Sequence, residues 1–110
     1  MGDEAIRTLI NNLDFGEAIR AAKEGKKISR KGWNGKNMFV YYVSEERHKI
    51  GESWTTNDDV KHLVEKVQED GKDEIVLLGH LCMFSAKSEI VVGWLASQTD
   101  ILADDWFVVE

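Results

Sequence analysis

Short apolar runs bounded by turn residues are the feature of this chain that most restricts its fold. Each run has four to six residues: Met38–Val43, Glu74–Leu78, Leu81–Phe84, Glu89–Val92 and Trp106–Val109. Their β-branched and aromatic content predicts strands, and none approaches the roughly 20 apolar residues that a membrane-spanning helix needs. The chain start also lacks the basic and apolar regions of a signal peptide, so we expect a cytoplasmic protein without a membrane segment.

Capping signals place a helix before the first of these runs. Asp14, with Glu17 three residues later, forms a capping box, and Gly25 is the expected stop, which predicts a helix through Ala22. Lys27–Arg30 is then expected to form a short strand that pairs with the following run as a hairpin.

A second amphipathic helix is predicted in the middle of the chain. A polar, irregular stretch over Ser44–Thr56 comes first, and Asn57 or Asp58 can then cap a helix that ends before Gly71. The apolar residues of this helix lie on one face: Val60, Leu63, Val64 and Val67.

Ser97 as N-cap and Asp100 as its capping-box partner predict a short helix before the final strand. The order of elements predicts one α+β domain over residues 1–110, with a small, mostly antiparallel sheet and flanking helices. Residues 1–14 carry apolar residues at helical spacing and are expected to form an N-terminal extension, either a short helix or an arm.

The net charge of −6 argues against binding long nucleic acid, because such binding depends mainly on Lys and Arg that neutralise phosphates. One basic cluster, Lys26, Lys27, Arg30 and Lys31, leads directly into Trp33 and could contact a phosphate locally. The other interpretation of the cluster is a solvated strand edge whose lysines discourage pairing.

Two tryptophan-bearing segments contain the candidate binding residues. Trp33 lies between glycines in Lys31–Gly35, and Trp94–Trp106 is rich in short hydrogen-bonding side chains. A flat ring beside turn glycines and short donors and acceptors is what a pocket for a planar, polar ligand needs. The alternative is that these tryptophans only cover a small core.

Signals for a nucleophile or a structural metal are weak. The single cysteine, Cys82, lies in an apolar run and is expected to be a buried, inert thiol. The three histidines, His48, His62 and His80, have no metal-ligand spacing. We therefore expect neither a metal nor another cofactor.

The best catalytic candidates are Asp100, Asp104 and Asp105, which could hold Mg²⁺ for phosphate-ester hydrolysis. Their simpler roles are a helix cap for Asp100 and a solvated turn for Asp104 and Asp105. The motifs of Walker loops, nucleophile elbows and dinucleotide-binding folds do not occur in the sequence, so we do not expect an enzyme.

Two longer motifs carry a family resemblance. The first runs from Phe15 through Gly25–Lys36 to Met38–Phe39, and the second is Trp94–Trp106. In this order they resemble a family of small phage and prophage proteins, the Thoeris anti-defence type two family. Residues 1–14 and a divergent middle region, 44–87, depart from the pattern.

The resemblance implies a counter-defence sponge in the cytoplasm of an infected bacterium. Family members bind cyclic ADP-ribose isomers made by TIR-domain enzymes without cleaving them, and some also hold cyclic dinucleotides of CBASS immunity in separate sites. The family further implies a homotetramer with ligand pockets at subunit interfaces. The apolar runs agree with assembly, because they give more strand surface than two or three short helices can shield.

On this hypothesis the ligand-binding residues divide by chemistry. Rings can stack on a base, short polar groups can bond ribose hydroxyls and base edges, and cations can face the pyrophosphate. The candidates in that order are Trp33 and Trp94; Asn34, Ser97, Thr99 and Asp100; and Arg30 and Lys31. Two alternatives stay open: a small metal-dependent cyclic-nucleotide phosphodiesterase, and a protein-interaction module that binds no nucleotide.

Overall fold

The computed structural model describes residues 11–34, 36–49 and 58–109, which belong to two compact units. The first unit combines the chain up to Val43 with the chain from His80 onward, and the second unit is residues 44–79. The divergent middle predicted over 44–87 therefore begins with the second unit and extends into the first. Antiparallel sheets with helices confirm the predicted α+β class. The predictions for residues 1–10 lie outside the described residues.

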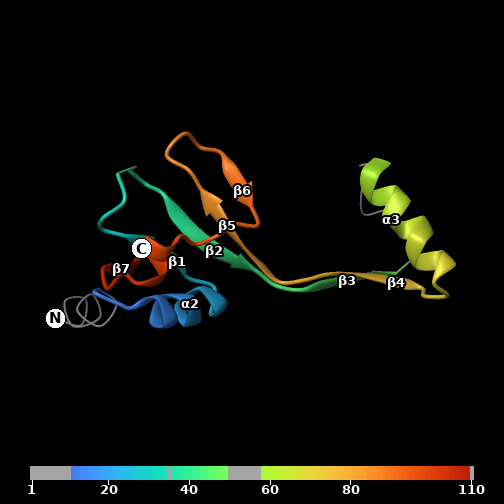
Figure 1. Ribbon diagram of the computed structural model, residues 1–110, viewed down its shortest axis with the longest axis horizontal. Helices are drawn as coiled ribbons and strands as arrows, with labels where there is room; N and C mark the ends of the chain where they lie inside the picture. Colours follow the sequence, from blue (N-terminus) through green and yellow to red (C-terminus); the bar gives the residue numbers. More distant parts are fainter. Residues whose placement is uncertain (1–10, 35, 50–57, 110) are drawn as a thin grey trace. The chain divides into compact units, whose positions relative to one another are not determined.

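The first unit is built on a five-stranded sheet in the order β6-β5-β2-β1-β7 (Figure 1). Every neighbouring pair in it is antiparallel. The strands are β1 (Lys27–Arg30), β2 (Phe39–Val43), β5 (His80–Phe84), β6 (Ile90–Val92) and β7 (Trp106–Val109). Each corresponds to a run that the sequence predicted as a strand.

Strand β1 lies inside the sheet, so its interpretation as a solvated edge is wrong. Ile28 faces Val40 of β2 on one side and Val108 of β7 on the other. The partner on the second side comes from the end of the chain. A pairing between segments so far apart leaves no local trace in the sequence around β1, which is why the lysines suggested an edge.

Helix α2 (Phe15–Lys23) begins at the predicted capping box. The Asp14 carboxylate accepts a hydrogen bond from the Glu17 backbone N–H at 2.7 Å, and Glu17 Oε1 accepts one from the Asp14 N–H at 3.0 Å. Gly25, with φ +96°, follows the helix in the left-handed region that glycine adopts without strain. These local signals confirm the predicted helix.

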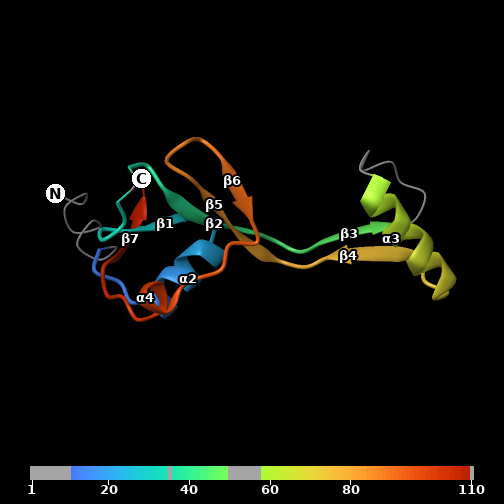
Figure 2. The ribbon, with the colours of Figure 1, turned by 45° about the horizontal axis from the view of Figure 1, so that its top comes forward.

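One face of the sheet is covered by α2. Ala18 and Ala22 of the helix are fully buried with Ile28, Val40 and Trp106 in the core of this unit. The short helix α4 (Gln98–Ile101) lies on the same side of the sheet as α2 (Figure 2). Two elements from opposite ends of the chain thus close the core from the same side.

The opposite face of the sheet is apolar and includes exposed side chains. Alternation along the paired strands assigns the following residues to it: Lys27, Ser29, Phe39, Tyr41, Val43, His80, Cys82, Phe84, Ile90, Val92, Phe107 and Val109. We call this the open face. Phe39 and Phe84 stack on it with ring centroids 5.1 Å apart, and the Lys27 ammonium lies 5.0 Å from the Phe39 centroid. Val92 is 70% exposed.

The second unit pairs β3 (Glu46–Lys49) with β4 (Glu74–Leu77), and α3 (Asp58–Glu69) lies between them in the chain. Strand β3 corrects the prediction that Ser44–Thr56 is irregular, at least over 46–49. Its four side chains are all polar, so it lacks the apolar alternation that marks a strand, and its partner β4 supplies the apolar residues. An ion pair of 2.7 Å joins Arg47 to Glu74 across the two strands.

The amphipathic pattern of α3 is confirmed in part. Val64 and Val67 are half-buried, whereas Leu63 on the same predicted face is 55% exposed. Gly71, with φ +76°, follows the helix as predicted. The proposed caps at Asn57 and Asp58 lie outside the residues whose side chains are described. None of the described helices is long and apolar enough to cross a membrane.

Candidate ligand-binding site

The two tryptophan-bearing segments, which lie at opposite ends of the sequence, meet in the first unit. Trp33 contacts Trp94 and Trp106 edge-on, with ring centroids 6.1 and 5.3 Å apart, and Trp94 and Trp106 are 6.4 Å apart. Edge-to-face packing at these separations is a favoured arrangement of aromatic rings. Trp106 is fully buried, whereas Trp33 and Trp94 are half-buried. We call these three residues the tryptophan cluster.

Asp100 of α4 bonds two members of the tryptophan cluster. The Trp33 indole N–H donates to Asp100 Oδ1 at 3.0 Å, and the Trp106 indole N–H donates to the Asp100 backbone carbonyl at 2.9 Å. These bonds fix two of the rings about their side-chain torsions.

The predicted capping box uses the Asp100 backbone N–H and the second carboxylate oxygen, Oδ2. The Asp100 N–H donates to Ser97 Oγ, and the Ser97 N–H donates to Asp100 Oδ2, each at 3.1 Å. Ser97 and Asp100 therefore hold α4 in place, which confirms the cap.

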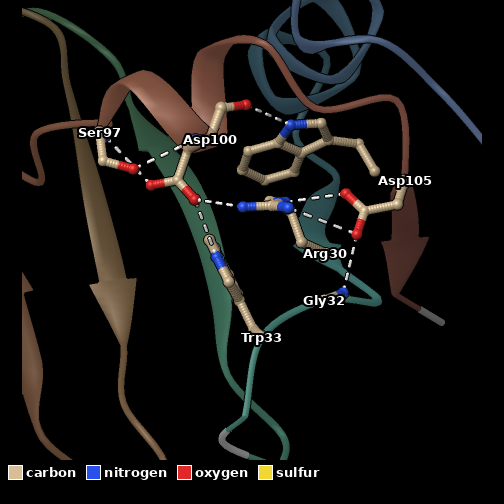
Figure 3. Close-up of polar contacts among 7 residues, drawn as sticks. Arg30, Gly32, Trp33, Ser97, Asp100 and Asp105 are labelled. Atoms are coloured by element: carbon tan, nitrogen blue, oxygen red, sulfur yellow. Dashed lines mark hydrogen bonds and ion pairs between the residues drawn. The ribbon is translucent and has the colours of Figure 1, made fainter.

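Arg30 of β1 lies between two carboxylates, as Figure 3 shows. Its Nη1 is 2.8 Å from Asp100 Oδ1, and its Nε is 2.8 Å from Asp105 Oδ1. The side chains of Arg30 and Asp100 are only 12% exposed, and that of Asp105 is 31% exposed. An ion-paired triad this sheltered is poorly screened by solvent, and loss of one partner would leave an uncompensated charge.

The triad is fully ionised at neutral pH. Burial alone would raise the pKa of Asp100, but hydrogen bonds from Trp33, Arg30 and Ser97 outweigh it and lower the pKa to about 2. The hydrogen bond from Arg30 lowers the pKa of Asp105 despite its burial, assisted by the Gly32 N–H. The bond to Asp105 in turn raises the pKa of Arg30.

Asp105 also holds the turn that leads to Trp33. The Gly32 N–H donates to Asp105 Oδ2 at 2.8 Å (Figure 3). The Lys31 N–H donates to the Asp105 backbone carbonyl at 3.2 Å. The Trp33 N–H closes the turn on the Arg30 carbonyl at 3.3 Å. The C-terminal segment thus fixes both the backbone and the ring of Trp33.

Comparison with known proteins places this arrangement in a family. The sequence matches the Thoeris anti-defense 2-like domain over residues 13–109. The chain belongs to this family. It is 31% identical over 97 residues to Thoeris anti-defense 2 of Bacillus phage SP01, and the alignment covers 88% of this chain and 94% of that protein. The resemblance read from the two tryptophan motifs is confirmed, and the match includes the middle region that departed from the expected pattern.

Membership of the Thoeris anti-defense 2-like family supports a phage anti-defence role. The family description is also consistent with a role that is not enzymatic. Neither the description nor the relative's name specifies a ligand.

The predicted site residues fall into two groups in the structure. Arg30, Ser97 and Asp100 are joined to one another or to the tryptophan cluster by the bonds described above. Lys31, Asn34 and Thr99 are exposed. The structure therefore brings all the predicted residues into one unit. Ser97 is exposed as well, so four of them lie at the surface, together with the half-buried Trp33 and Trp94.

Two hollows lie on the sheet of the first unit, and one of them includes predicted site residues. Arg30 and Lys31 contribute to one of about 340 Å³, with Ser29, Asn37, Met38, Phe107 and Val109. The other, of about 390 Å³, is lined by Gly25, Lys27, Phe39, Tyr41, Tyr42 and Phe84. Both volumes fall within the range of small-molecule sites, about 300–1,000 Å³.

Two residues matter more than the sequence indicated. Asp105 was expected to lie in a solvated turn with Asp104; Asp104 is exposed, but Asp105 is half-buried and bonded to Arg30 and Gly32. Trp106 begins the final strand, as expected, and is in addition the buried centre of the tryptophan cluster. The sequence signal for this role of Trp106 was its position as the last residue of the second tryptophan motif, Trp94–Trp106.

A metal site of ordinary composition is not present in the described part of the chain. No group of three or more His, Cys, Asp or Glu side chains gathers there as ligands. Of the three aspartates considered for Mg²⁺, Asp100 and Asp105 are bonded to Arg30 instead. A divalent ion between them would have to displace this guanidinium.

Proposed function

We propose that this member of the Thoeris anti-defense 2-like family is a sponge that binds cyclic nucleotide immune signals in the cytoplasm of an infected bacterium and does not cleave them. The proposed ligands are cyclic ADP-ribose isomers from TIR-domain enzymes, with CBASS cyclic dinucleotides as further candidates. The observation that carries the proposal is the contact between Trp33 and Trp94, with the Trp33 ring fixed by its hydrogen bond to Asp100.

The proposal assigns stacking to the half-buried rings. A purine that covers the outer part of Trp33 or Trp94 gains roughly 1–3 kcal/mol from stacking, on the scale of nucleic-acid systems. Asn34 directly follows Trp33, and Thr99 directly precedes Asp100; both are exposed and can bond ribose hydroxyls or base edges. Lys31 is exposed and provides the cation for the pyrophosphate, because the Arg30 guanidinium is already paired with two carboxylates.

Sequestration requires slow release more than fast capture. The bonds from Asp100 and Asp105 fix Trp33 before any ligand arrives, so binding does not have to order the ring or its turn. Interactions that are formed in advance mainly reduce the dissociation rate. A preformed site of this kind suits a protein that competes with an immune receptor for a scarce signal.

We further propose a homotetramer in which ligand pockets lie between subunits. The open face carries stacked Phe39 and Phe84 and the exposed β6 residues Ile90 and Val92. Apolar sheet surface of this kind is covered in a stable protein. A second copy of the chain is the proposed cover of the open face.

Geometry weighs against the two alternatives. Hydrolysis with Mg²⁺ on Asp100, Asp104 and Asp105 requires the removal of Arg30 from the first and third of these carboxylates. A purely structural role suits Trp106, which is fully buried, better than Trp33 and Trp94, which retain exposed surface.

The test is to express the protein beside an active TIR-domain enzyme and identify small molecules released from the purified protein by mass spectrometry. The proposal predicts a cyclic ADP-ribose isomer in wild-type protein and its loss in Trp94→Ala, with Leu95→Ala, at an 89% exposed neighbour, as the matched control. No bound nucleotide in wild type would reject the sponge in favour of an interaction module. Release of linear products only, in a manner that EDTA abolishes, would favour the phosphodiesterase.

A further inference from the structure

The turn that carries Trp33 is held from one side by a single residue, Asp105. Its Oδ2 accepts from the Gly32 N–H at 2.8 Å, its Oδ1 accepts from Arg30 Nε at 2.8 Å, and its backbone carbonyl accepts from the Lys31 N–H at 3.2 Å. The three donors are consecutive residues, whereas Asp105 is 73 positions from Gly32. The three bonds therefore hold the residues that immediately precede Trp33.

Gly32 makes this approach possible. A Cβ atom built on Gly32 would lie 2.9 Å from Asp105 Oδ2 and 3.2 Å from Arg30 Nη2, closer than carbon normally approaches these atoms. The carboxylate therefore occupies space that any other residue at position 32 would need. Glycine suits this position because it has no Cβ atom to separate the backbone from the carboxylate.

We propose that Asp105 is a positioning residue for ligand binding: through Gly32 and Arg30 it fixes the turn so that Trp33 and Asn34 meet the ligand in one conformation, without touching the ligand itself. This inference rests on the proposed function. Without Asp105 the turn has to be ordered at each binding event, which weakens affinity chiefly through faster release.

Asp105→Asn is the most informative variant because the side chain keeps its shape. An amide has one acceptor oxygen, but Gly32 N–H and Arg30 Nε each need an acceptor, so one of the two bonds is lost. Asp104→Asn is the matched control, since it removes the same charge at the exposed neighbouring position. The probe is a cyclic ADP-ribose isomer purified from a TIR-domain enzyme reaction.

Two measurements are made on each full-length variant. We expect Asp105→Asn to bind the probe about tenfold more weakly, mostly through dissociation rate, on the scale of a lost charge-assisted hydrogen bond. We also expect the Gly32 amide proton to exchange with solvent about tenfold faster, because it has lost its acceptor. Asp104→Asn should leave both values unchanged.

Gly32→Ala approaches the same contact from the other side and serves if Asp105→Asn does not fold. The added methyl should displace the carboxylate and weaken binding as Asp105→Asn does. Combining Gly32→Ala with Asp105→Ala removes the closer contact, with Asp105 Oδ2, so the double variant should bind no more weakly than Asp105→Ala alone. Additive losses would mean that the two residues act independently, and would overturn the proposal.

The result that rejects positioning is distinct from the result that rejects the sponge. If wild type binds the probe and Asp105→Asn binds it equally well, Asp105 does not position the site. If wild type binds nothing, the proposed function fails. In that case exchange of the Gly32 amide still decides whether Asp105 holds the turn.

Discussion

The indole N–H of Trp33 donates a hydrogen bond to the carboxylate of Asp100, at 3.0 Å and across 67 positions of sequence. The same carboxylate oxygen accepts a bond from Arg30, and the other oxygen belongs to the helix cap with Ser97. One side chain therefore connects a strand, a turn and a helix that come from both ends of the chain. The consequences of removing its charge follow directly from these contacts.

Asp100→Asn should destabilise the protein by about 1–3 kcal/mol, because the buried Arg30 loses one of its two anionic partners. Urea unfolding followed by tryptophan fluorescence measures this, and the folded variant should also show altered emission as Trp33 loses its charged acceptor. Asp104→Asn, at an exposed position, is the control and should unfold like wild type. Equal stability of the two variants would show that the triad contributes little.

Acid should weaken the fold through the same carboxylate. The pKa of Asp100 is lowered from 3.8 to about 2, so its ionised form stabilises the folded state. That stabilisation is complete above about pH 5, is lost as the pH falls from about 4 to about 2, and is worth about 2 kcal/mol. The free energy of unfolding should therefore fall less over this interval in Asp100→Asn than in wild type; parallel pH curves for the two proteins would contradict the assignment.

Features that depend on neighbouring residues could be predicted from the sequence, whereas features that depend on distant segments could not. The caps at Asp14 and Ser97 were predicted correctly because each involves residues three positions apart. The position of β1 and the acceptor for Arg30 were not, because their partners lie on the C-terminal segment.

Strand β3 shows a second limit of pattern analysis. All four residues of Glu46–Lys49 are polar, so the segment has no apolar alternation, and the apolar residues of the pair lie on β4. The ligand-binding roles of Trp33 and Trp94 stay predictions, but their proximity is an observation that neither motif alone could establish.

The three tryptophans should separate folding from binding. Trp106→Ala should cost about 3–5 kcal/mol, because it leaves a large void at a fully buried position and removes the N–H bonded to the Asp100 carbonyl. Trp94→Ala removes a half-buried ring and should keep the fold while it abolishes ligand binding. Melting temperature and titration with a cyclic ADP-ribose isomer report the two effects; retention of full affinity by folded Trp94→Ala would remove this ring from the site.

Assembly should depend on the open face. Val92→Lys places a charge on a 70% exposed residue of β6 that the fold of one subunit does not need. We expect it to convert a tetramer to dimers or monomers in light scattering. Ala86→Lys, in the turn between β5 and β6, adds the same charge off this face and should leave the mass unchanged. A wild-type monomer with full ligand affinity would defeat both the tetramer and the interface-pocket model.

The most direct test of the account is the fate of the ligand itself. The protein is incubated with a slight excess of a cyclic ADP-ribose isomer, freed of unbound ligand, and then heated, and the released small molecules are quantified by mass spectrometry. The account predicts that the isomer is recovered intact, in a fixed ratio to subunits and independent of incubation time. Progressive conversion to a cleaved product, or the absence of any retained isomer, would contradict it.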